Sequence, residues 1–258
     1  MILKKQHLYF DKTPIDDVPA ALSMYSEKEF MSPTRSTIPL LSLLKDGDEI
    51  LGSIFSEMNM EIASDLHLEF TVDPPKGCGI ASHTDLMVIS SLGTLAIEAK
   101  WTEPRYETVE EWIKPGNREL VLRGWLDLLQ LQSNRLLKPE DFSGMVYQMV
   151  HRAASACYKS EYPQLAYLHF VPDLSERGAT SAQYQSDLEH LFNLLGKPDK
   201  FNFYLIEVEI KPTLSFEIIK SLPKASSETA NTVRAALENG PLFEFKDFSL
   251  HTIKGGSL

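Results

Sequence analysis

The stretch SHTDLMVISSLGTLAIEAKW, residues 82–101, decides the fold because it holds two short strands and the turn between them. Residues 84–89 and 94–99 are rich in aliphatic and β-branched side chains, which favours β-strands. The turn at 90–93 contains a glycine, which supplies backbone conformations that other residues disfavour. We therefore expect an antiparallel hairpin in the middle of a sheet.

This hairpin brings three charged side chains to one face of the sheet. Asp85 and Glu98 are equally far from the turn centre, so they should lie opposite each other, with Cβ atoms about 5 Å apart. Lys100 lies two residues beyond Glu98 and points to the same face. Two carboxylates this close repel each other unless positive charge lies between them. A hard divalent cation, Mg²⁺ or Mn²⁺, would supply that charge.

The reaction class that fits these side chains is metal-assisted phosphodiester hydrolysis. Asp85 and Glu98 would hold the metal, which takes its remaining ligands from water and substrate phosphate. Lys100 would orient or help deprotonate the attacking water, or stabilise the charged transition state. The alternative is a solvated cross-strand cluster of ion pairs, which would contribute little energy.

At these residues the sequence resembles the PD-(D/E)xK nuclease superfamily, which has the restriction-endonuclease-like fold. The core order of that fold is helix, three strands, helix, strand, and the match in element order covers residues 46–171. The resemblance implies that Asp85 and Glu98 bind the metal and that Lys100 is the catalytic lysine. Thr84 stands where many members of the superfamily have proline.

A second part of the resemblance lies in the run YQMVHRAAS, residues 147–155, which is similar to a helix in a branch of uncharacterised bacterial members. Exonuclease-type relatives carry a helical glutamine followed four residues later by tyrosine. Gln148 matches that glutamine, whereas Arg152 stands in the place of the tyrosine. We expect Gln148 and Arg152 to contact substrate phosphates or base edges. The alternative for each is an ordinary helix surface.

A further carboxylate could come from the helix expected at 46–64. Glu57 and Glu61 are four residues apart and share a helix face that borders the apolar stripe. We expect Glu57 to be the additional metal ligand, the alternative being a solvated helix edge. For Glu69 and Asp73, at the first strand, ordinary surface positions are the simpler interpretation. Glu103, Glu107, Glu110 and Glu111 form an acidic run after Lys100, which we interpret as a solvated face.

The pattern E-x-K carries no information without the hairpin, because it occurs three times. Glu209 and Lys211 even follow a Pro-Asp pair, but residues 201–210 form one continuous strand with no turn, which keeps Asp199 and Glu209 apart. Ten steps along a strand span about 33 Å, so these two carboxylates cannot hold one ion. Glu244 and Lys246 have no hairpin partner.

These elements predict one α/β (α+β) domain over residues 1–258, with a restriction-endonuclease-like mixed sheet flanked by helices in the order αβββαβ. The nuclease-like core is expected at 46–171. Residues 1–45 form an irregular N-terminal elaboration with one short helix near 18–25, and 172–258 form a C-terminal elaboration. Further helices are expected at 109–113, 118–132, 142–158, 182–195 and 227–239, and further strands at 66–72, 165–171, 201–210, 242–246 and 250–253.

Composition limits the classes of function. The 258 residues contain 25 Lys and Arg against 36 Asp and Glu, a net charge of −11. This acidity argues against a general nucleic-acid coat protein, which needs surplus basic side chains. Residues 98–159 are balanced, however, with nine basic and nine acidic residues, so a phosphate-bearing substrate is not excluded. The main alternative to a nuclease is a catalytically silent binding or interaction module on the same fold.

The remaining expectations concern location and partners. The two cysteines, Cys78 and Cys157, form no C-x-x-C pair, which favours a reducing cytoplasm over a disulfide framework. No apolar run approaches the roughly 18–20 residues of a membrane span, and the N-terminus has no signal-peptide pattern. We expect a cytoplasmic protein with a nucleic-acid substrate and no membrane contact. The oligomeric state stays open, a homodimer included.

Overall fold

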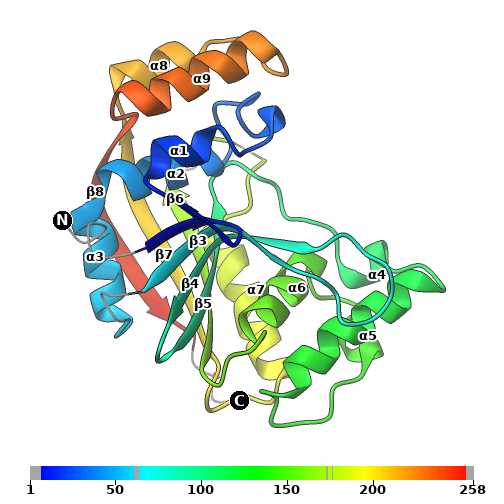
Figure 1. Cartoon of the computed structure of the whole chain (residues 1–258). Helices are drawn as coiled ribbons and strands as arrows, with labels where there is room; N and C mark the ends of the chain where they lie inside the picture. The colour runs from blue at the N-terminus through cyan, green and yellow to red at the C-terminus, as the bar shows by residue number, and fades with distance from the viewer. Residues whose placement is uncertain (1–6, 61–63, 173, 176, 254–258) are drawn as a thin grey trace.

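The computed structural model describes residues 7–60, 64–172, 174–175 and 177–253. Within these residues a single sheet has the strand order β2-β1-β3-β4-β5-β6-β7-β8. Figure 1 shows the sheet in the middle of the molecule with helices on both sides. The strands are β1 (His7–Phe10), β2 (Thr13–Ile15), β3 (Asp65–Val72), β4 (Ser82–Ser90), β5 (Gly93–Lys100), β6 (Pro163–Val171), β7 (Asn202–Pro212) and β8 (Phe243–Thr252).

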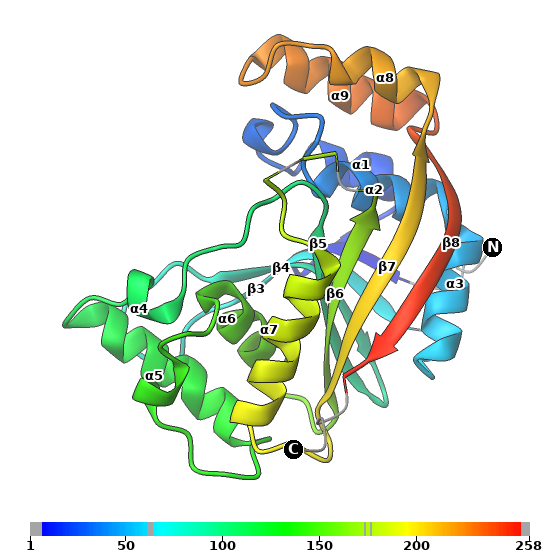
Figure 2. The same cartoon turned by 180° about the vertical axis from the view of Figure 1, so that it is seen from behind.

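The helices divide into two groups, one on each face of the sheet (Figure 2). The first group is α1 (Val18–Leu22), α2 (Thr37–Asp46), α3 (Asp48–Glu57), α8 (Leu214–Lys220) and α9 (Ser227–Asn239). The second group is α4 (Val109–Trp112), α5 (Asn117–Gln130), α6 (Tyr147–Ala156) and α7 (Ser181–Leu194). Two short 3₁₀ helices, η2 (Glu27–Glu29) and η3 (Pro139–Phe142), lie in connections. We call the two sides the α3 face and the α6 face.

The connections explain the mixed character of the sheet. β3, β4 and β5 follow one another through loops without helices and pair antiparallel. β5 and β6 are joined through α4, α5 and α6, and β6 and β7 through α7, so both pairs are parallel. The predicted α/β class with a mixed sheet flanked by helices is confirmed. The order helix, three strands, helices, strand is present between α3 and β6.

The β4–β5 hairpin has the predicted register. Its pairs run from Ser90 opposite Gly93 to Leu86 opposite Ile97, so one further step sets Asp85 against Glu98. Gly93 has a φ of 148°, and a Cβ there would lie 2.2 Å from the carbonyl oxygen of Tyr162. Glycine is therefore required at this turn for both its dihedral and its lack of a side chain.

Alternation along the hairpin separates two apolar cores. Leu86, Val88 and Ile97 are buried in the core of the α3 face. Met87 and Ala96 are buried in the core of the α6 face. Because successive strand residues point to opposite faces, Asp85, Glu98 and Lys100 belong to the α6 face. The faces are closed by different helices, and this decides which helices can contribute to the site.

The N-terminal segment differs from the irregular elaboration that we predicted. β1 pairs in parallel with β3 and extends the sheet. Residues 37–46 form the buried helix α2, although they contain Pro39. A proline in the first turn of a helix costs little, because the first amides have no intrahelical acceptor. Pro19 and Pro39 therefore lie in the first turns of α1 and α2, whereas Pro33 lies in a turn.

Three other boundaries differ from the prediction. The helix expected at 46–64 spans only Asp48–Glu57 in α3 and is followed by Asn59 at a φ of 52°. The helix expected at 142–158 is shortened to α6, with η3 before it. The two strands expected at 242–246 and 250–253 are one strand, β8, with a register shift against β7. The short helix α8 was not predicted.

Candidate functional site

The hairpin and α6 hold the predicted charged residues in one cluster. One carboxylate oxygen of Asp85, Oδ2, accepts a hydrogen bond from the backbone amide of Ala99 at 2.8 Å. Glu98 and Lys100 are both only 2% exposed, beneath helix α6. The structure therefore brings Asp85, Glu98 and Lys100 together, as the register predicted. A solvated surface ion-pair cluster, the alternative interpretation, is excluded by this burial.

Glu98 is the centre of the hydrogen-bond network. Its Oε1 accepts from the ammonium of Lys100 at 2.9 Å and from Nε2 of Gln148 at 2.8 Å. Its Oε2 accepts from Nε of Arg152. The ammonium of Lys100 also donates to Oε1 of Gln148 at 2.8 Å. Three donors occupy three of the four acceptor positions of this buried carboxylate, so Glu98 is held in one position.

The electrostatics keep this pair ionised. Burial alone would raise the pKa of Glu98, but the charges of Arg152 and Lys100 hold it below its usual range. Burial would likewise lower the pKa of Lys100, but the carboxylate of Glu98 raises it above the ordinary lysine value. Lys100 is therefore a protonated ammonium, which also lies 4.6 Å from the ring centre of Tyr106. As a cation it can stabilise negative charge but cannot accept a proton.

Asp85 has a different environment. Burial and the charge of Glu98 raise its pKa well above the ordinary aspartate value. The β3–β4 register, with Leu68 opposite Leu86, places Glu69 against Asp85 on its other side. Within the described residues Oδ1 of Asp85 accepts no hydrogen bond. Asp85 is thus a carboxylate flanked by two others and short of positive partners.

Glu69 is the residue that the sequence interpretation set aside. Its φ of 52° is a left-handed conformation, which costs about 1–2 kcal/mol for a side chain with a Cβ. This conformation breaks the alternation of side chains along β3. Leu68 and Phe70 would share a face in a regular strand, but Leu68 is buried in the core of the α3 face and Phe70 in that of the α6 face. Burial and the charge of Glu29 raise the pKa of Glu69 to about 7. Strained backbone at a buried charge is typical of functional sites.

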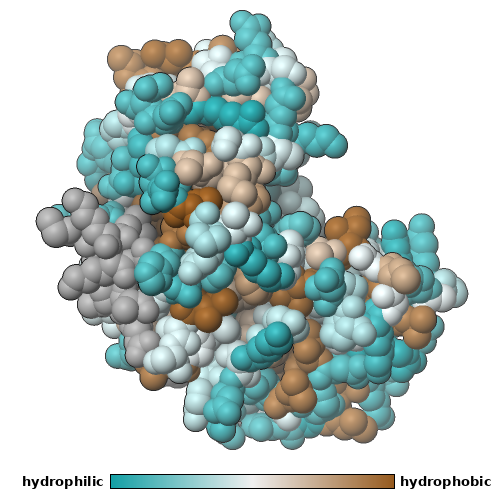
Figure 3. Space-filling model, in the orientation of Figure 1, coloured by the Kyte–Doolittle hydropathy of each residue, from teal (hydrophilic) through white to brown (hydrophobic). Residues whose placement is uncertain are grey.

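These side chains surround a cavity of about 170 Å³. Five of its lining residues are carboxylates and three are Lys or Arg, which leaves a surplus of two negative charges when all are ionised. Figure 3 shows that the surface is hollowed between the part containing α1, α2, α8 and α9 and the part containing α4 and α5. The lining residues are Glu29, Arg35, Ser36, Thr37, Glu69, His83, Asp85, Glu98, Lys100, Glu103, Tyr106, Gln148 and Arg152.

The donor set fits a hard divalent cation held with the help of other ligands. Asp85 and Glu98 offer carboxylate oxygens, and the charge surplus of the cavity equals the charge of one such cation. Among the described residues no three His, Cys, Asp or Glu side chains converge closely enough to hold a metal by themselves. A bound Mg²⁺ would therefore keep several water or phosphate ligands, as this ion prefers.

Helix α6 supplies the other predicted residues. Gln148 and Arg152 are one helical turn apart, and both reach Glu98. A terminal nitrogen of Arg152, Nη1, donates to Oγ of Ser82 at 2.7 Å, and Ser82 is also 2.9 Å from Nδ1 of His151. Both predicted contact residues thus lie at the site, and Ser82 and His151 join them.

Other predicted residues lie elsewhere. Glu57 is exposed on α3, which packs on the opposite face of the sheet, so it does not line the cavity. The expectation that it is a metal ligand is wrong for that reason. Glu61 lies outside the described residues. Glu244, from a second E-x-K pattern, forms exposed ion pairs with Lys211 and Lys246 away from the cavity.

The sequence interpretation also missed Glu103, which it assigned to a solvated acidic face. Its carboxylate accepts from the backbone amides of Trp101 and Ser36, each at 2.8 Å. Glu103 therefore ties the N-terminal segment to the end of β5 and closes one side of the cavity. Its position three residues after Lys100 was the only sign in the sequence that Glu103 lies near the site. That sign could not be interpreted without the contact to Ser36.

Comparisons with known proteins add a family but no activity. A family model described as "Domain of unknown function (DUF6946)" matches residues 14–219. Comparisons with curated proteins and with solved structures give no match. None of the helices in the described part of the chain is long and apolar enough to cross a bilayer.

Proposed function

The chain belongs to the DUF6946 family, and from its site we propose that it is a metal-dependent nuclease that hydrolyses phosphodiester bonds in DNA or RNA. The observation that carries the proposal is the cavity in which Asp85, Glu98 and Lys100 meet, whose lining has two more carboxylates than Lys and Arg side chains. The same arrangement supports the proposed relation to the PD-(D/E)xK superfamily.

Each residue has a role that its environment supports. Asp85 and Glu98 would hold Mg²⁺ or Mn²⁺, which would polarise the scissile phosphate and lower the pKa of a bound water. Lys100 is protonated and fixed by Glu98 and Gln148, so it acts as a positive charge beside the reacting phosphate. Glu69, whose pKa is raised to about 7, would add negative charge to the cavity once a bound cation favours its ionised form.

Gln148 and Arg152 bind substrate only through atoms that the Glu98 network leaves over. Arg152, which lines the cavity, donates from Nε to Glu98 and from Nη1 to Ser82, and no hydrogen bond to a described residue occupies its second terminal nitrogen, Nη2. A guanidinium anchored in this way presents donors to a phosphate oxygen without moving. The substrate contact proposed for Arg152 is therefore with the phosphate backbone. Such a contact does not distinguish DNA from RNA.

The test is cleavage of single- and double-stranded DNA and RNA with Mg²⁺ or Mn²⁺. Removing a charge that stabilises a transition state costs about 10²–10³ in rate, so Lys100→Met and Asp85→Asn should each lose that much. Lys246→Met is the matched control, because Lys246 belongs to an exposed E-x-K pattern. Metal-dependent cleavage that survives Lys100→Met and Asp85→Asn, or no cleavage by the wild type, would contradict the proposal.

The second candidate is a binding module that has lost hydrolysis. It is favoured by the three donors to Glu98, from Lys100, Gln148 and Arg152, which compete with a metal for its oxygens. Titration calorimetry with Mn²⁺ separates the candidates. Binding that disappears in Glu98→Gln favours the nuclease, whereas no heat with wild-type protein favours the module.

We further propose a cytoplasmic location and a nucleic-acid partner. The support for the location is that Cys78 is exposed, Cys157 is buried and both are free thiols. A reducing compartment keeps such thiols free. The test is the distribution of a fluorescently tagged full chain in fractionated cells, where recovery in a membrane or secreted fraction contradicts the location.

A further inference from the structure

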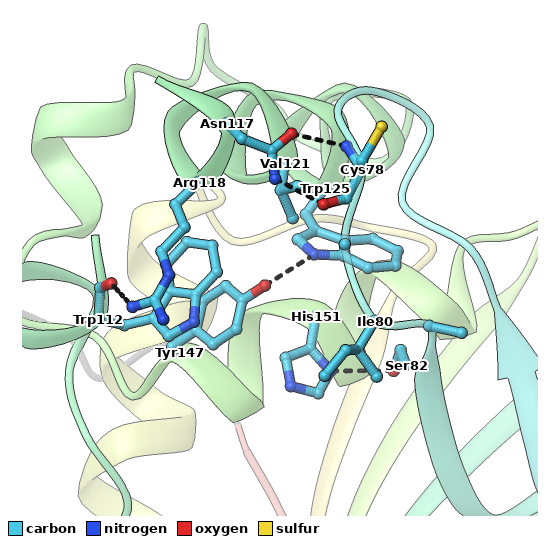
Figure 4. A pocket seen from close by; sticks show the side chains of 12 residues that line it. Cys78, Ile80, Ser82, Trp112, Asn117, Arg118, Val121, Trp125, Tyr147 and His151 are labelled. Carbon is cyan, nitrogen blue, oxygen red and sulfur yellow. Dashed lines mark hydrogen bonds between the residues drawn. The ribbon is translucent and has the colours of Figure 1, made fainter. Parts of the chain in front are cut away.

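A second cavity, which we call the aromatic cavity, lies beside the site. Its volume is about 370 Å³, within the range of pockets that hold small organic ligands. Figure 4 shows the loop at residues 78–82 on one side and side chains of α4, α5 and α6 on the other. Its walls are built by Cys78, Gly79, Ile80, Ala81, Ser82, Trp112, Asn117, Arg118, Val121, Trp125, Tyr147 and His151.

The loop that forms one wall is fixed in place. The side-chain amide of Asn117 accepts from the backbone amide of Cys78 at 2.7 Å and donates to its carbonyl at 2.5 Å (Figure 4). Gly77 has a φ of 76°, and a Cβ there would lie 2.8 Å from Val121. Only a glycine allows the loop to approach α5 this closely. The cavity is therefore preformed.

Aromatic rings provide flat contact surfaces in this cavity. The rings of Trp112 and Tyr147 are stacked at 3.6 Å and 10°. The indole nitrogen of Trp125 donates to the hydroxyl of Tyr147 at 3.2 Å and fixes the orientation of that ring. Ile80, which is 89% exposed, lies at the mouth and offers an apolar surface without any packing role. Such walls favour a flat, uncharged heterocycle.

His151 adds a directed hydrogen-bond donor. Nδ1 of His151 lies 2.9 Å from Ser82, whose oxygen already accepts from the always-protonated Arg152. Nη1 of Arg152, which is always a donor, also lies 3.4 Å from Nδ1 and favours an unprotonated Nδ1. The hydroxyl of Ser82 then donates to Nδ1, and the proton of the neutral imidazole is on Nε2. Burial and the charge of Arg152 lower the pKa of His151 well below its usual value, so the ring is neutral. Nε2 lies on the side of the ring away from Ser82 (Figure 4).

The aromatic cavity is continuous with the proposed catalytic cavity. A third cavity of about 290 Å³ lies between them and shares lining residues with both. On α6, Tyr147 and His151 line the aromatic cavity, whereas Gln148 and Arg152 line the catalytic one. These two pairs form adjacent rows on one helix, so a ligand can occupy both cavities at once.

The charges differ sharply between the two cavities. Arg118 is the charged residue among those that line the aromatic cavity, and none of the described lining residues is a carboxylate. Its guanidinium lies 5.3 Å from the ring centre of Trp112 and can bind a phosphate at the mouth. Because the chain carries a net charge of −11, affinity for a polyanion must come from contacts to bases rather than from the overall field.

We propose that the aromatic cavity binds one unpaired nucleobase of a single-stranded substrate, next to the phosphodiester held at Asp85, Glu98 and Lys100. This inference rests on the proposed function for the neighbouring phosphate, but base binding itself needs no hydrolysis. The base stacks on the aromatic wall and accepts from Nε2 of His151, while Arg118 pairs with a flanking phosphate. A base within a duplex cannot enter, so single strands are bound in preference to duplexes.

The test measures binding of fluorescein-labelled single-stranded DNA and RNA ten-mers by anisotropy, in the Asp85→Asn background with Mg²⁺. Loss of one base stack weakens binding about 5- to 150-fold. We expect that loss in Trp112→Leu and also in Ile80→Glu, where an exposed side chain is replaced and the fold is unaffected. Tyr158→Leu, at an exposed tyrosine after the end of α6, is the matched control and should bind normally.

Ten-mers with one abasic residue, moved along the strand, should show the same loss at one register position. Three results would overturn the inference. They are equal binding by Ile80→Glu and the wild-type protein, equal binding of duplex and single strand, and no binding of either DNA or RNA. Failure of the proposed function would look different. Single strands would still bind in a way that depends on Trp112 and Ile80, but no cleavage that depends on Lys100 would be seen. Lys100-dependent cleavage that ignores abasic residues overturns only the base site.

Discussion

Glu69 gives a prediction that tests the charge balance of the catalytic cavity without any substrate. Its pKa is about 7 in the folded protein and 4.5 as the ordinary value, so the folded state holds this proton more tightly than the unfolded state. At 1.36 kcal/mol for each tenfold change, the difference is up to about 3 kcal/mol. The side chain is 25% exposed, so most of this value survives solvent screening.

The direction follows from proton linkage. Below pH 4.5 Glu69 is protonated in both the folded and the unfolded state, so it does not change the free energy of unfolding. Between pH 4.5 and about 7 the folded state binds more protons than the unfolded state, so the free energy of unfolding falls as pH rises. In Glu69→Gln this loss is absent. The variant should therefore gain up to about 3 kcal/mol over the wild type between pH 4.5 and 8.

The assay is urea unfolding in EDTA at intervals from pH 4.5 to 8, with Glu57→Gln as the control for an exposed glutamate outside the cavity. A divalent cation should remove the pH dependence of the wild type and stabilise it by about 2.7 kcal/mol at 100 times its Kd. Mg²⁺ should stabilise Asp85→Asn far less. If Glu69→Gln and wild type keep a constant difference across this pH range, the cavity does not carry the charge surplus.

Three further predictions concern the structure around the site. Gly93→Ala should lower the free energy of unfolding by more than about 1 kcal/mol in urea, because its Cβ would lie 2.2 Å from a backbone oxygen, whereas Gly144→Ala, with open space, should be neutral. Arg152→Leu should lower the free energy of unfolding by about 3–5 kcal/mol, because it leaves Glu98 partly unpaired. The double variant Arg152→Leu with Glu98→Leu should recover part of that loss, and additive losses in it would contradict the pairing. Trp101→Ala should cost about 3–5 kcal/mol in the same assay, since this ring is 1% exposed, and a smaller loss than 1 kcal/mol would show that the core relaxes around it.

Part of the candidate site was predictable because it depends on local geometry. A turn with a glycine and two strands with a side-chain period of two are enough to place Asp85, Glu98 and Lys100 on one face. Gln148 and Arg152 were predicted from a resemblance and from helical spacing. The structure brings both to Glu98.

Other parts were not predictable from local patterns. Glu57 has helical spacing suited to a shared face, but α3 packs against the opposite face of the sheet. Glu69 should alternate with its neighbours in a regular strand, and only its φ of 52° shows that β3 twists there. Glu103 looked like one of several solvated acids until the N-terminal segment supplied Ser36 as its partner.

The sequence by itself determined the hairpin, its register and the convergence of one acid pair with a lysine, because these follow from residues close together in the chain. Tertiary structure alone decided which face α3 and α6 cover, which carboxylates lack a positive partner, and that an aromatic cavity lies beside the catalytic one. These features depend on burial and on contacts between segments far apart in sequence. Burial sets the energy of each charge, and no local pattern records it.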